Sequence, residues 1–334
     1  MVRTPPALFA IVATSIERSL LRPVNRALRA IVLAGIAAIL AGLSPARAQS
    51  ASNLFVDCRG QATASPTVIL ESGAFGTSAD WDLVLDDLAK GGKVCAYDRA
   101  GVGASPARDG SEDVVSIARE LGDLLDALGE TRPVILVGHS NGALYAETFA
   151  AMWPQRVAGL VYVNGVTSND ISDPRLLADL RRERRLSNLA ATAAGLGLAP
   201  LAAPSVVRAE GLPPEARRRK LWALSRPRRL RVARDEDRAI VPGLYVTANL
   251  GGSPSEIPTA VIFGSTDPDE VLAQAWRGAE AVPADKARLG WVLDAPGATH
   301  VSPLSRDRAY VAAAVDWLRS LAAAPASAAT TPQH

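Results

Sequence analysis

Gly138-His139-Ser140-Asn141-Gly142 is the stretch that decides the fold of this 334-residue chain. It follows an apolar run at 133–137 and precedes a helical pattern over 143–153. A Gly-x-Ser-x-Gly placed between a buried strand and a helix is typical of a nucleophile elbow, a strained turn that exposes the serine hydroxyl. Glycine is expected at 138 and 142 because side chains there would collide with neighbouring backbone. Ser140 is therefore the candidate nucleophile. The alternative is an ordinary strand-to-helix turn that contains two glycines.

A serine hydroxyl needs a base to remove its proton and a third group to orient that base. The chain has only three histidines. His139 lies inside the elbow, where we expect its side chain to diverge from the serine hydroxyl, and His334 is the last residue of a tail rich in Ala, Pro and Thr. His300 follows an apolar run at 290–293 and precedes the last predicted helix, which makes it the candidate base.

Asp267 is the candidate acid of the site. It lies in the turn at 265–268, which leaves a predicted buried strand at 258–264. At the carboxyl end of that strand it is well placed to accept the N–H of His300. Asp269 and Glu270 are rivals, but we expect them to open the following helix, where carboxylates are favoured. The chain order Ser, Asp, His is the order expected with this elbow motif.

Four blocks resemble the serine-dependent α/β-hydrolase family between about residues 54 and 321: LESGAFG at 70–76, YDRAGVG at 97–103, the elbow, and the Asp267/His300 pair. The resemblance implies an α/β-hydrolase fold, with a mostly parallel central sheet flanked by helices and a helical cap insertion. Asp98 and Arg99 in the second block are expected to shape the loop below the site through packing and an ion pair, rather than to take part in chemistry.

The same resemblance implies an oxyanion hole made of two backbone N–H groups, each commonly contributing a few kcal/mol. One is the N–H of Asn141, and the other is a backbone N–H near Ala74 or Phe75. Many relatives carry His-Gly where this chain has Ser72-Gly73, so the identity of the second donor stays open.

Two features separate this chain from other branches of the family. Epoxide hydrolases and haloalkane dehalogenases of this fold attack with an aspartate at the elbow, and Ser140 argues against both. Some relatives place the acid after the preceding strand, where this chain has Asn164. An amide at that position favours Asp267 as the acid.

The amino terminus is predicted to be a secretory signal peptide. Three arginines between residues 22 and 29 precede an uncharged run at 30–43 and the sequence Ala46-Arg47-Ala48, which indicates cleavage after Ala48. The run is shorter than the roughly 20 apolar residues of a membrane span, although an uncleaved anchor is the alternative. Loss of residues 1–48 removes six arginines and one glutamate, which changes the formal net charge from +2 to −3. The expected location is the periplasm or the exterior, and this charge balance argues against nucleic acid as a partner.

The two cysteines, Cys58 and Cys95, lie in predicted strands at 54–58 and 93–97. The family resemblance implies that these strands are neighbours. A disulfide is plausible in an oxidising compartment, and two buried free cysteines are the alternative.

The predicted domain organisation has four parts after the leader: a core at 49–166, a cap at 167–250, a second core segment at 251–321 and a disordered tail at 322–334. The cap carries 16 Lys and Arg against 9 Asp and Glu, with charge runs at 181–185 and 217–220. These arginines either attract an anionic substrate or a phospholipid surface, or form a solvated helix face. The apolar stretch at 189–207, with Leu196, Leu198 and Leu201, is a candidate pocket lining.

The sequence therefore predicts an exported serine hydrolase that cleaves a carboxylic ester of a small, partly apolar molecule. No metal or cofactor is implied, because no Cys/His cluster has ligand spacing. An amidase, a lactonase, a cofactor-free perhydrolase and a C–C hydrolase are alternatives that use the same three residues. A receptor-like protein that binds a ligand with little turnover is the alternative from another class.

Overall fold

The computed structural model describes residues 53–193, 209, 211–264 and 269–323. The predicted signal peptide, the candidate acid Asp267, the leucines at 196, 198 and 201 and most of the predicted disordered tail lie outside these described residues.

A seven-stranded sheet forms the centre of the fold, with the strand order β1-β3-β2-β4-β5-β6-β7. All neighbouring strands are parallel except β1, which pairs antiparallel with β3. The central strands are short apolar runs because helices cover both faces of the sheet. Their bounds are β1 Val56–Arg59, β2 Val68–Glu71, β3 Val94–Tyr97, β4 Val134–His139, β5 Val157–Val163, β6 Thr259–Phe263 and β7 Gly290–Asp294.

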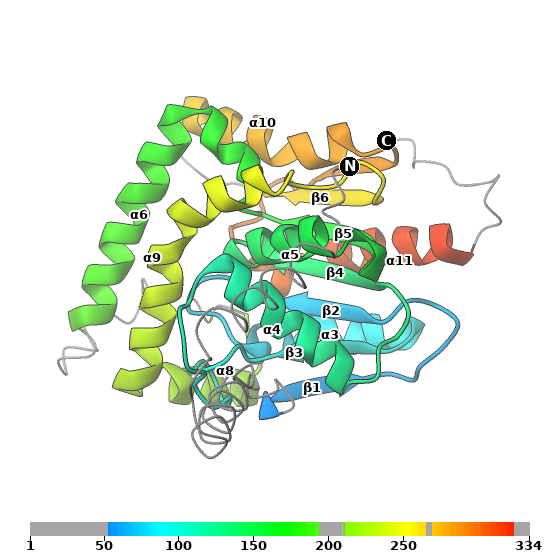
Figure 1. The fold of residues 1–334 in the computed structure, drawn as a ribbon, viewed down its shortest axis with the longest axis horizontal. Helices are drawn as coiled ribbons and strands as arrows, with labels where there is room; N and C mark the ends of the chain where they lie inside the picture. Colours follow the sequence, from blue (N-terminus) through cyan, green and yellow to red (C-terminus); the bar gives the residue numbers. More distant parts are fainter. Residues whose placement is uncertain (1–52, 194–208, 210, 265–268, 324–334) are drawn as a thin grey trace, which may run out of the picture. The chain divides into compact units, whose positions relative to one another are not determined.

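Helices pack on the two faces of this sheet (Figure 1). One face is covered by η2 (Ser78–Trp81), α3 (Asp82–Leu88) and α11 (Ala309–Ala323). The other is covered by α4 (Val114–Ala127), α5 (Asn141–Met152) and α10 (Glu270–Lys286). Short 3-10 turns connect the elements at η3 Ala89–Gly91, η4 Pro154–Arg156 and η7 Ser302–Leu304. Successive residues of the central strands alternate between the two apolar cores, as in other layered α/β folds.

Local contacts set the ends of the helices on the first face. Asp80 accepts the N–H of Thr77 where η2 begins, and this 3-10 turn continues directly into α3. The closing helix α11 begins at Ala309. Hydrogen bonds of Ser302 with Thr299 and Asp307 hold the preceding residues in turns, so these residues are not part of the helix.

The described part of the cap is helical and lies between β5 and β6 in the sequence. It consists of η5 (Ser168–Ser172), α6 (Pro174–Ala193), α8 (Pro214–Leu224) and α9 (Pro227–Asn249). The long helices α6 and α9 run side by side next to the sheet (Figure 1). Among the described residues, no helix combines the length and the hydropathy that a membrane crossing requires.

Buried ion pairs and apolar contacts join the cap to the core. Lys220 of α8 contacts Asp80 at 2.5 Å, and both side chains are buried. Phe75 of the core packs in an apolar cluster with cap residues from all three helices: Ala191, Leu224, Leu230 and Ala233. The cap therefore lies directly on the loop that follows β2.

A disulfide bond joins Cys58 to Cys95. The two residues stand directly opposite each other in the antiparallel β1–β3 pair, so the expected neighbourhood of the two strands is confirmed. Of the two alternatives that the sequence leaves open for these cysteines, the structure has the bridged one.

Candidate active site

Ser140 occupies a strained turn between β4 and α5. Its backbone angles are φ 54° and ψ −124°, a combination that non-glycine residues adopt only where the surrounding structure enforces it. Three backbone hydrogen bonds hold Ser140 in this conformation. Its N–H donates to the Val163 carbonyl, and its own carbonyl accepts from the N–H groups of Ala143 and Val166. The side chain is half-buried. These contacts place Ser140 at the carboxyl end of a central strand.

The two elbow glycines are required by the close approach of backbone. A Cβ atom on Gly138 would lie 2.5 Å from the Gly142 carbonyl oxygen, and a Cβ on Gly142 would lie 2.3 Å from the Glu71 carbonyl oxygen. Both separations are far inside van der Waals contact. The collision that the sequence motif predicts is therefore present at both positions.

His300 lies close to the elbow, with its main chain held by two side chains. The Nε2 atom of His139 lies 2.8 Å from the His300 carbonyl oxygen, and Asn164 donates its Nδ2–H to the same oxygen at 3.0 Å. The imidazole rings of His139 and His300 have their centroids 4.8 Å apart. The residue directly before Ser140 thus contacts the candidate base.

The end of β6 packs against the loop that carries His300, although Asp267 itself lies outside the described residues. Asn164 accepts the N–H of Gly264 at 2.7 Å, and a Cβ on Gly264 would lie 2.6 Å from the Ala298 Cβ. Asn164 therefore connects the strand that leads to Asp267 with the main chain of His300. The sequence reasoning used this residue only to argue against an alternative acid.

Asp269 and Glu270 open α10, as expected. Asp269 is the N-cap, and its carboxylate accepts the N–H groups of Val271 and Leu272, while Glu270 is the first helical residue.

The loop after β2 lies against Ser140. A Cβ on Gly73 would approach the Ser140 Cβ to 2.9 Å, so only glycine lets this loop come so close. Two residues further, Phe75 has a φ of 54° and is buried below the cap. The candidate donors Ala74 and Phe75 therefore belong to a loop that contacts Ser140 on one side and the cap on the other.

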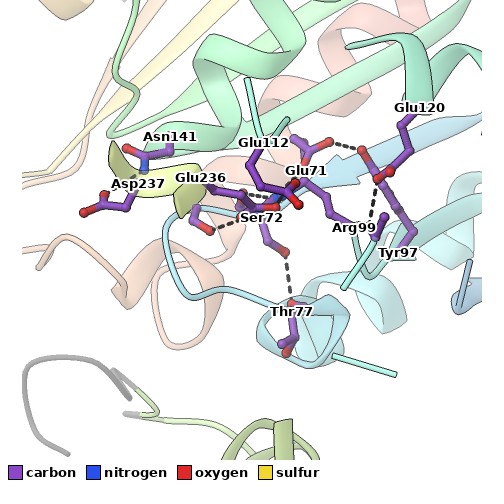
Figure 2. Close-up of polar contacts among 12 residues, drawn as sticks. Glu71, Ser72, Thr77, Tyr97, Arg99, Glu112, Glu120, Asn141, Glu236 and Asp237 are labelled. Atoms are coloured by element: carbon purple, nitrogen blue, oxygen red, sulfur yellow. Dashed lines mark hydrogen bonds and ion pairs between the residues drawn. The ribbon is translucent and has the colours of Figure 1, made fainter. Parts of the chain in front are cut away.

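A buried network of charges lies below this loop (Figure 2). Arg99 contacts Glu71 at 2.6 Å and Glu236 at 2.8 Å, and all three side chains are about 2% exposed. Tyr97 donates a hydrogen bond to Glu71, and the guanidinium of Arg99 lies over the ring of Tyr145. Burial raises the pKa of Glu71 to about 7, against the attraction of Arg99.

The neighbouring Asp98 has a structural role of its own. Its carboxylate accepts the N–H groups of Ser78 and Ala104, each at 2.7 Å. Asp98 thereby orders the turn that begins η2, while the adjacent Arg99 makes ion pairs. The partner Glu236 comes from α9 of the cap, 137 residues away, and no local sequence signal singles it out.

The side chain of Asn141 is held by the cap at both ends. It donates from Nδ2 to Asp237 at 3.3 Å, and its Oδ1 accepts from Arg184 at 2.5 Å. Arg184 also lies 3.7 Å from the Asp237 carboxylate, and Asn188 donates to the other oxygen of that carboxylate at 3.4 Å. A cluster of cap side chains therefore surrounds Asn141, the residue that follows Ser140.

Some charged side chains of the cap runs are exposed to solvent, and others contact the core. On α6, Arg181, Arg182 and Arg185 are exposed, while Arg184 turns towards Asn141. On α8 the first two arginines of the run at 217–220 are exposed, and the last two residues form ion pairs with the core. Contact of the exposed arginines with a phospholipid surface stays a prediction. Within the part of the chain that the structure describes, no grouping of three or more His, Cys, Asp or Glu could hold a metal ion.

Comparison with known families agrees with this geometry. The model of the alpha/beta hydrolase family matches residues 68–314, a range that includes the loop after β2, the elbow, the cap and His300. The chain belongs to the alpha/beta hydrolase family.

Named relatives match a shorter segment. The protein named "Putative carbamate hydrolase RutD" of Variovorax paradoxus is 41% identical over 99 residues, which is 29% of this chain and 37% of the relative. The protein of the same name from Stutzerimonas stutzeri is 35% identical over 115 residues, or 34% of this chain and 43% of the relative. The chain thus spans less than half the length of these curated relatives.

Solved structures share the fold over most of the chain. A protein described as a "putative epoxide hydrolase" from Pseudomonas aeruginosa has a TM-score of 0.62 at 20% identity, covering 80% of this chain and 92% of that one. A thermophilic esterase from Thermogutta terrifontis has a TM-score of 0.58 at 22% identity, covering 80% and 93%. At this identity the likeness shows the fold alone.

Proposed function

We propose that this protein is an exported serine hydrolase that cleaves a carboxylic ester through an acyl-enzyme intermediate. The observation that carries the proposal is the conformation of Ser140. A strained serine at a strand end, in contact with the loop after β2 and one residue from the side chain that holds His300, is the arrangement that nucleophilic acyl transfer needs.

In the proposed mechanism, Ser140 Oγ attacks the ester carbonyl carbon while His300 takes the hydroxyl proton. Asp267 orients the imidazole of His300. The N–H of Asn141 and an amide of Ala74 or Phe75 donate to the developing oxyanion. Collapse of the tetrahedral intermediate breaks the bond to the leaving oxygen, which receives the proton from His300. Water then attacks the acyl-enzyme by the same route, and the acid is released with Ser140 regenerated.

The test is hydrolysis of p-nitrophenyl esters from acetate to palmitate by the protein and by Ser140→Ala. Turnover that is lost in the variant, together with labelling of Ser140 by a fluorophosphonate, supports the proposal. Labelling without ester turnover overturns ester specificity and leaves a competent serine. Absence of both overturns the catalytic assignment. Labelling followed by a single slow turnover with tight ligand retention favours the receptor-like alternative instead.

Carbamate cleavage is a second candidate, favoured by the relatives named for that activity. The carbonyl of a carbamate is less electrophilic than that of an ester, because the nitrogen donates electrons into it, but the same nucleophile, base and oxyanion donors serve both reactions. Comparison of kcat/KM for phenyl acetate and phenyl carbamate separates the two candidates. Epoxide opening is not proposed, because Ser140 stands where the epoxide hydrolases of this fold carry an aspartate.

Export is proposed on the signal-peptide pattern of residues 22–48, and the Cys58–Cys95 disulfide is consistent with an oxidising compartment. Expression of the full-length sequence in a bacterial host, followed by fractionation and amino-terminal sequencing, tests it. A mature protein that begins at Gln49 in the periplasm or medium supports export, and an intact amino terminus in the cytoplasm contradicts it.

A further inference from the structure

Glu236 and Asp237 are consecutive buried acids on the cap helix α9, each about 1% exposed. Consecutive helical residues point about 100° apart around the helix axis, so these two side chains reach different parts of the core. Figure 2 shows Glu236 directed towards Arg99 and Asp237 directed towards Asn141. The two contacts lead to the two candidate halves of the oxyanion hole.

Glu236 reaches the loop after β2 through Arg99. Its carboxylate accepts from Arg99 Nε at 2.9 Å and from Nη2 at 2.8 Å. Arg99 in turn donates to the carbonyl oxygens of Ser72 at 2.7 Å and Gly73 at 3.2 Å. A pair of hydrogen bonds to the carboxylate fixes the plane of the guanidinium, and with it the direction of the donors that reach the loop.

The hydrogen bond from Arg99 to the Gly73 carbonyl affects the direction of one candidate oxyanion donor, the Ala74 N–H. The Gly73 C=O and the Ala74 N–H belong to the same planar peptide unit and point in opposite directions. When Arg99 holds the carbonyl, the Ala74 N–H points away from Arg99. The sequence leaves Ala74 and Phe75 open as the second oxyanion donor. Because this contact fixes the direction of the Ala74 N–H, the geometry favours Ala74.

Asp237 contacts Asn141, which supplies the other half of the proposed oxyanion hole. Its carboxylate accepts from the side chain of Asn141 at 3.3 Å, while Arg184 holds the opposite end of the same amide. Asn141 is the first residue of α5, and its backbone N–H is the second proposed donor. Because the side chain is held at both ends and is 1% exposed, the orientation of this residue depends on contacts from the cap.

We propose that Glu236 and Asp237 are positioning residues through which the cap orients both halves of the oxyanion hole. The inference rests on the proposed function of Ser140. It adds that the cap is part of the catalytic geometry: a displacement of α9 disturbs the Ala74 and Asn141 donors together. The apolar packing of Phe75 against the cap couples the same loop to the same helix.

The adjacent residue Asp235 provides a matched control. It lies on the same helix and pairs with Arg234 and Arg238 of α9 itself, and its side chain is 41% exposed. A change at Asp235 therefore alters the charge of α9 by the same amount without touching the core.

The experiment compares Glu236→Ala, Asp237→Ala and Asp235→Ala in the full-length protein, once Ser140→Ala has shown that turnover depends on the serine. Competent sites are counted by fluorophosphonate titration, and kcat is expressed per titrated site on a p-nitrophenyl ester. The second readout is the inhibition constant of a trifluoromethyl ketone, which forms a tetrahedral adduct with the serine.

We expect Asp237→Ala and Glu236→Ala to lower kcat per titrated site by roughly 10- to 100-fold. The inhibition constant of the ketone should rise by a similar factor, while KM stays within about 3-fold of the wild-type value. Complete loss of an oxyanion donor commonly costs about 100- to 1,000-fold, and a misdirected donor costs less. Asp235→Ala should have the kcat per titrated site and the ketone inhibition constant of the wild type. Asp237→Asn retains an oxygen that accepts from Asn141 and should recover most of the kcat.

A purely structural role for these acids predicts fewer titratable sites and a lower Tm, with unchanged kcat per site and unchanged ketone affinity. That result overturns the inference while leaving the proposed function intact. Where Glu236→Ala does not fold, Asp237→Ala and its rescue by Asp237→Asn decide the question. A wild-type protein without serine-dependent turnover overturns the proposed function, and this inference falls with it.

Discussion

His139 Nε2 lies 2.8 Å from the carbonyl oxygen of His300. Because a carbonyl oxygen only accepts, the imidazole of His139 donates from Nε2, which fixes its tautomer. The residue that precedes the nucleophile in the sequence therefore holds the main chain of the proposed base, 161 residues away. The elbow and the proposed base are therefore joined by a direct contact between His139 and the His300 main chain.

This contact predicts a graded effect of histidine substitutions. His300→Ala should abolish serine-dependent turnover, whereas His139→Ala should lower kcat by roughly 10- to 100-fold, because a displaced base costs about that much. His334→Ala serves as the control. Equal loss in His139→Ala and His300→Ala would contradict the assignment of His300 as the only base.

The elbow glycines predict a steric effect on stability. Gly142→Ala would place a methyl group 2.3 Å from a backbone oxygen, and we expect it to lower the free energy of unfolding by at least about 2 kcal/mol. The matched control is Gly278→Ala in α10, where no atom outside the adjoining helix backbone lies within 4 Å of the added Cβ. That substitution should stabilise the protein by about 0.5–1 kcal/mol, because alanine is the better helix former. Urea denaturation of the two variants measures both changes in the free energy of unfolding. An unchanged free energy of unfolding in Gly142→Ala would refute the steric argument.

Asp170 predicts a pH-dependent stability. Its carboxylate caps η5 through the N–H of Thr167, and burial raises its pKa from 3.8 to about 8. Between these values the folded protein binds a proton that the unfolded chain has lost. The contribution of Asp170 to stability is therefore complete below about pH 4 and declines as the pH rises towards 8.

The variant Asp170→Asn should remove this contribution to the pH dependence. Relative to the wild type, its free energy of unfolding should rise between about pH 5 and about pH 8.5, as measured by urea denaturation at both pH values. Asp285→Asn, at an exposed position of α10, is the control and should show no such trend. A constant difference between Asp170→Asn and the wild type would show that Asp170 titrates normally.

The disulfide predicts sensitivity to reduction. Cys58 and Cys95 are 37 residues apart in the sequence, and closing a loop of that length in the unfolded chain contributes about 4 kcal/mol in the chain-entropy model. Treatment with dithiothreitol, or the double substitution of both cysteines by alanine, should lower the denaturation midpoint accordingly. Thiol titration of the unreduced, unfolded protein should detect no free thiol, and two thiols per chain would show that the bridge is absent.

Much of the core could be predicted from the sequence because its signals are local. The strand before Ser140, the order of the elements and the caps of helices such as the one at Asp269 each depend on a few neighbouring residues. The collision that requires Gly138 and Gly142 is likewise a property of one tight turn. These predictions succeed because the buried sheet needs apolar runs and the elbow permits few residue types.

The contacts between cap and core could not be predicted in this way. Arg184 stands in a run of five charged residues, and only the helical phase of α6 turns it towards Asn141 while its neighbours face solvent. Glu236 and Asp237 lie in the charged run Arg-Asp-Glu-Asp-Arg at 234–238, which is typical of an exposed helix, yet both are buried. Their partners are 137 and 96 residues away, so only the packing of α9 on the core reveals them.

The buried ion pairs between cap and core limit how this chain can be recombined with its relatives. A chimera that carries a foreign cap on this core leaves Asp80 without Lys220, and an unpaired buried charge costs about 3–5 kcal/mol. Arg99 loses Glu236 in the same chimera and keeps Glu71 as its ion-pair partner. Here the exchangeable unit must include the charged partners on the core side, so new specificity is reached more easily by substitutions within the existing cap than by transplanting another one.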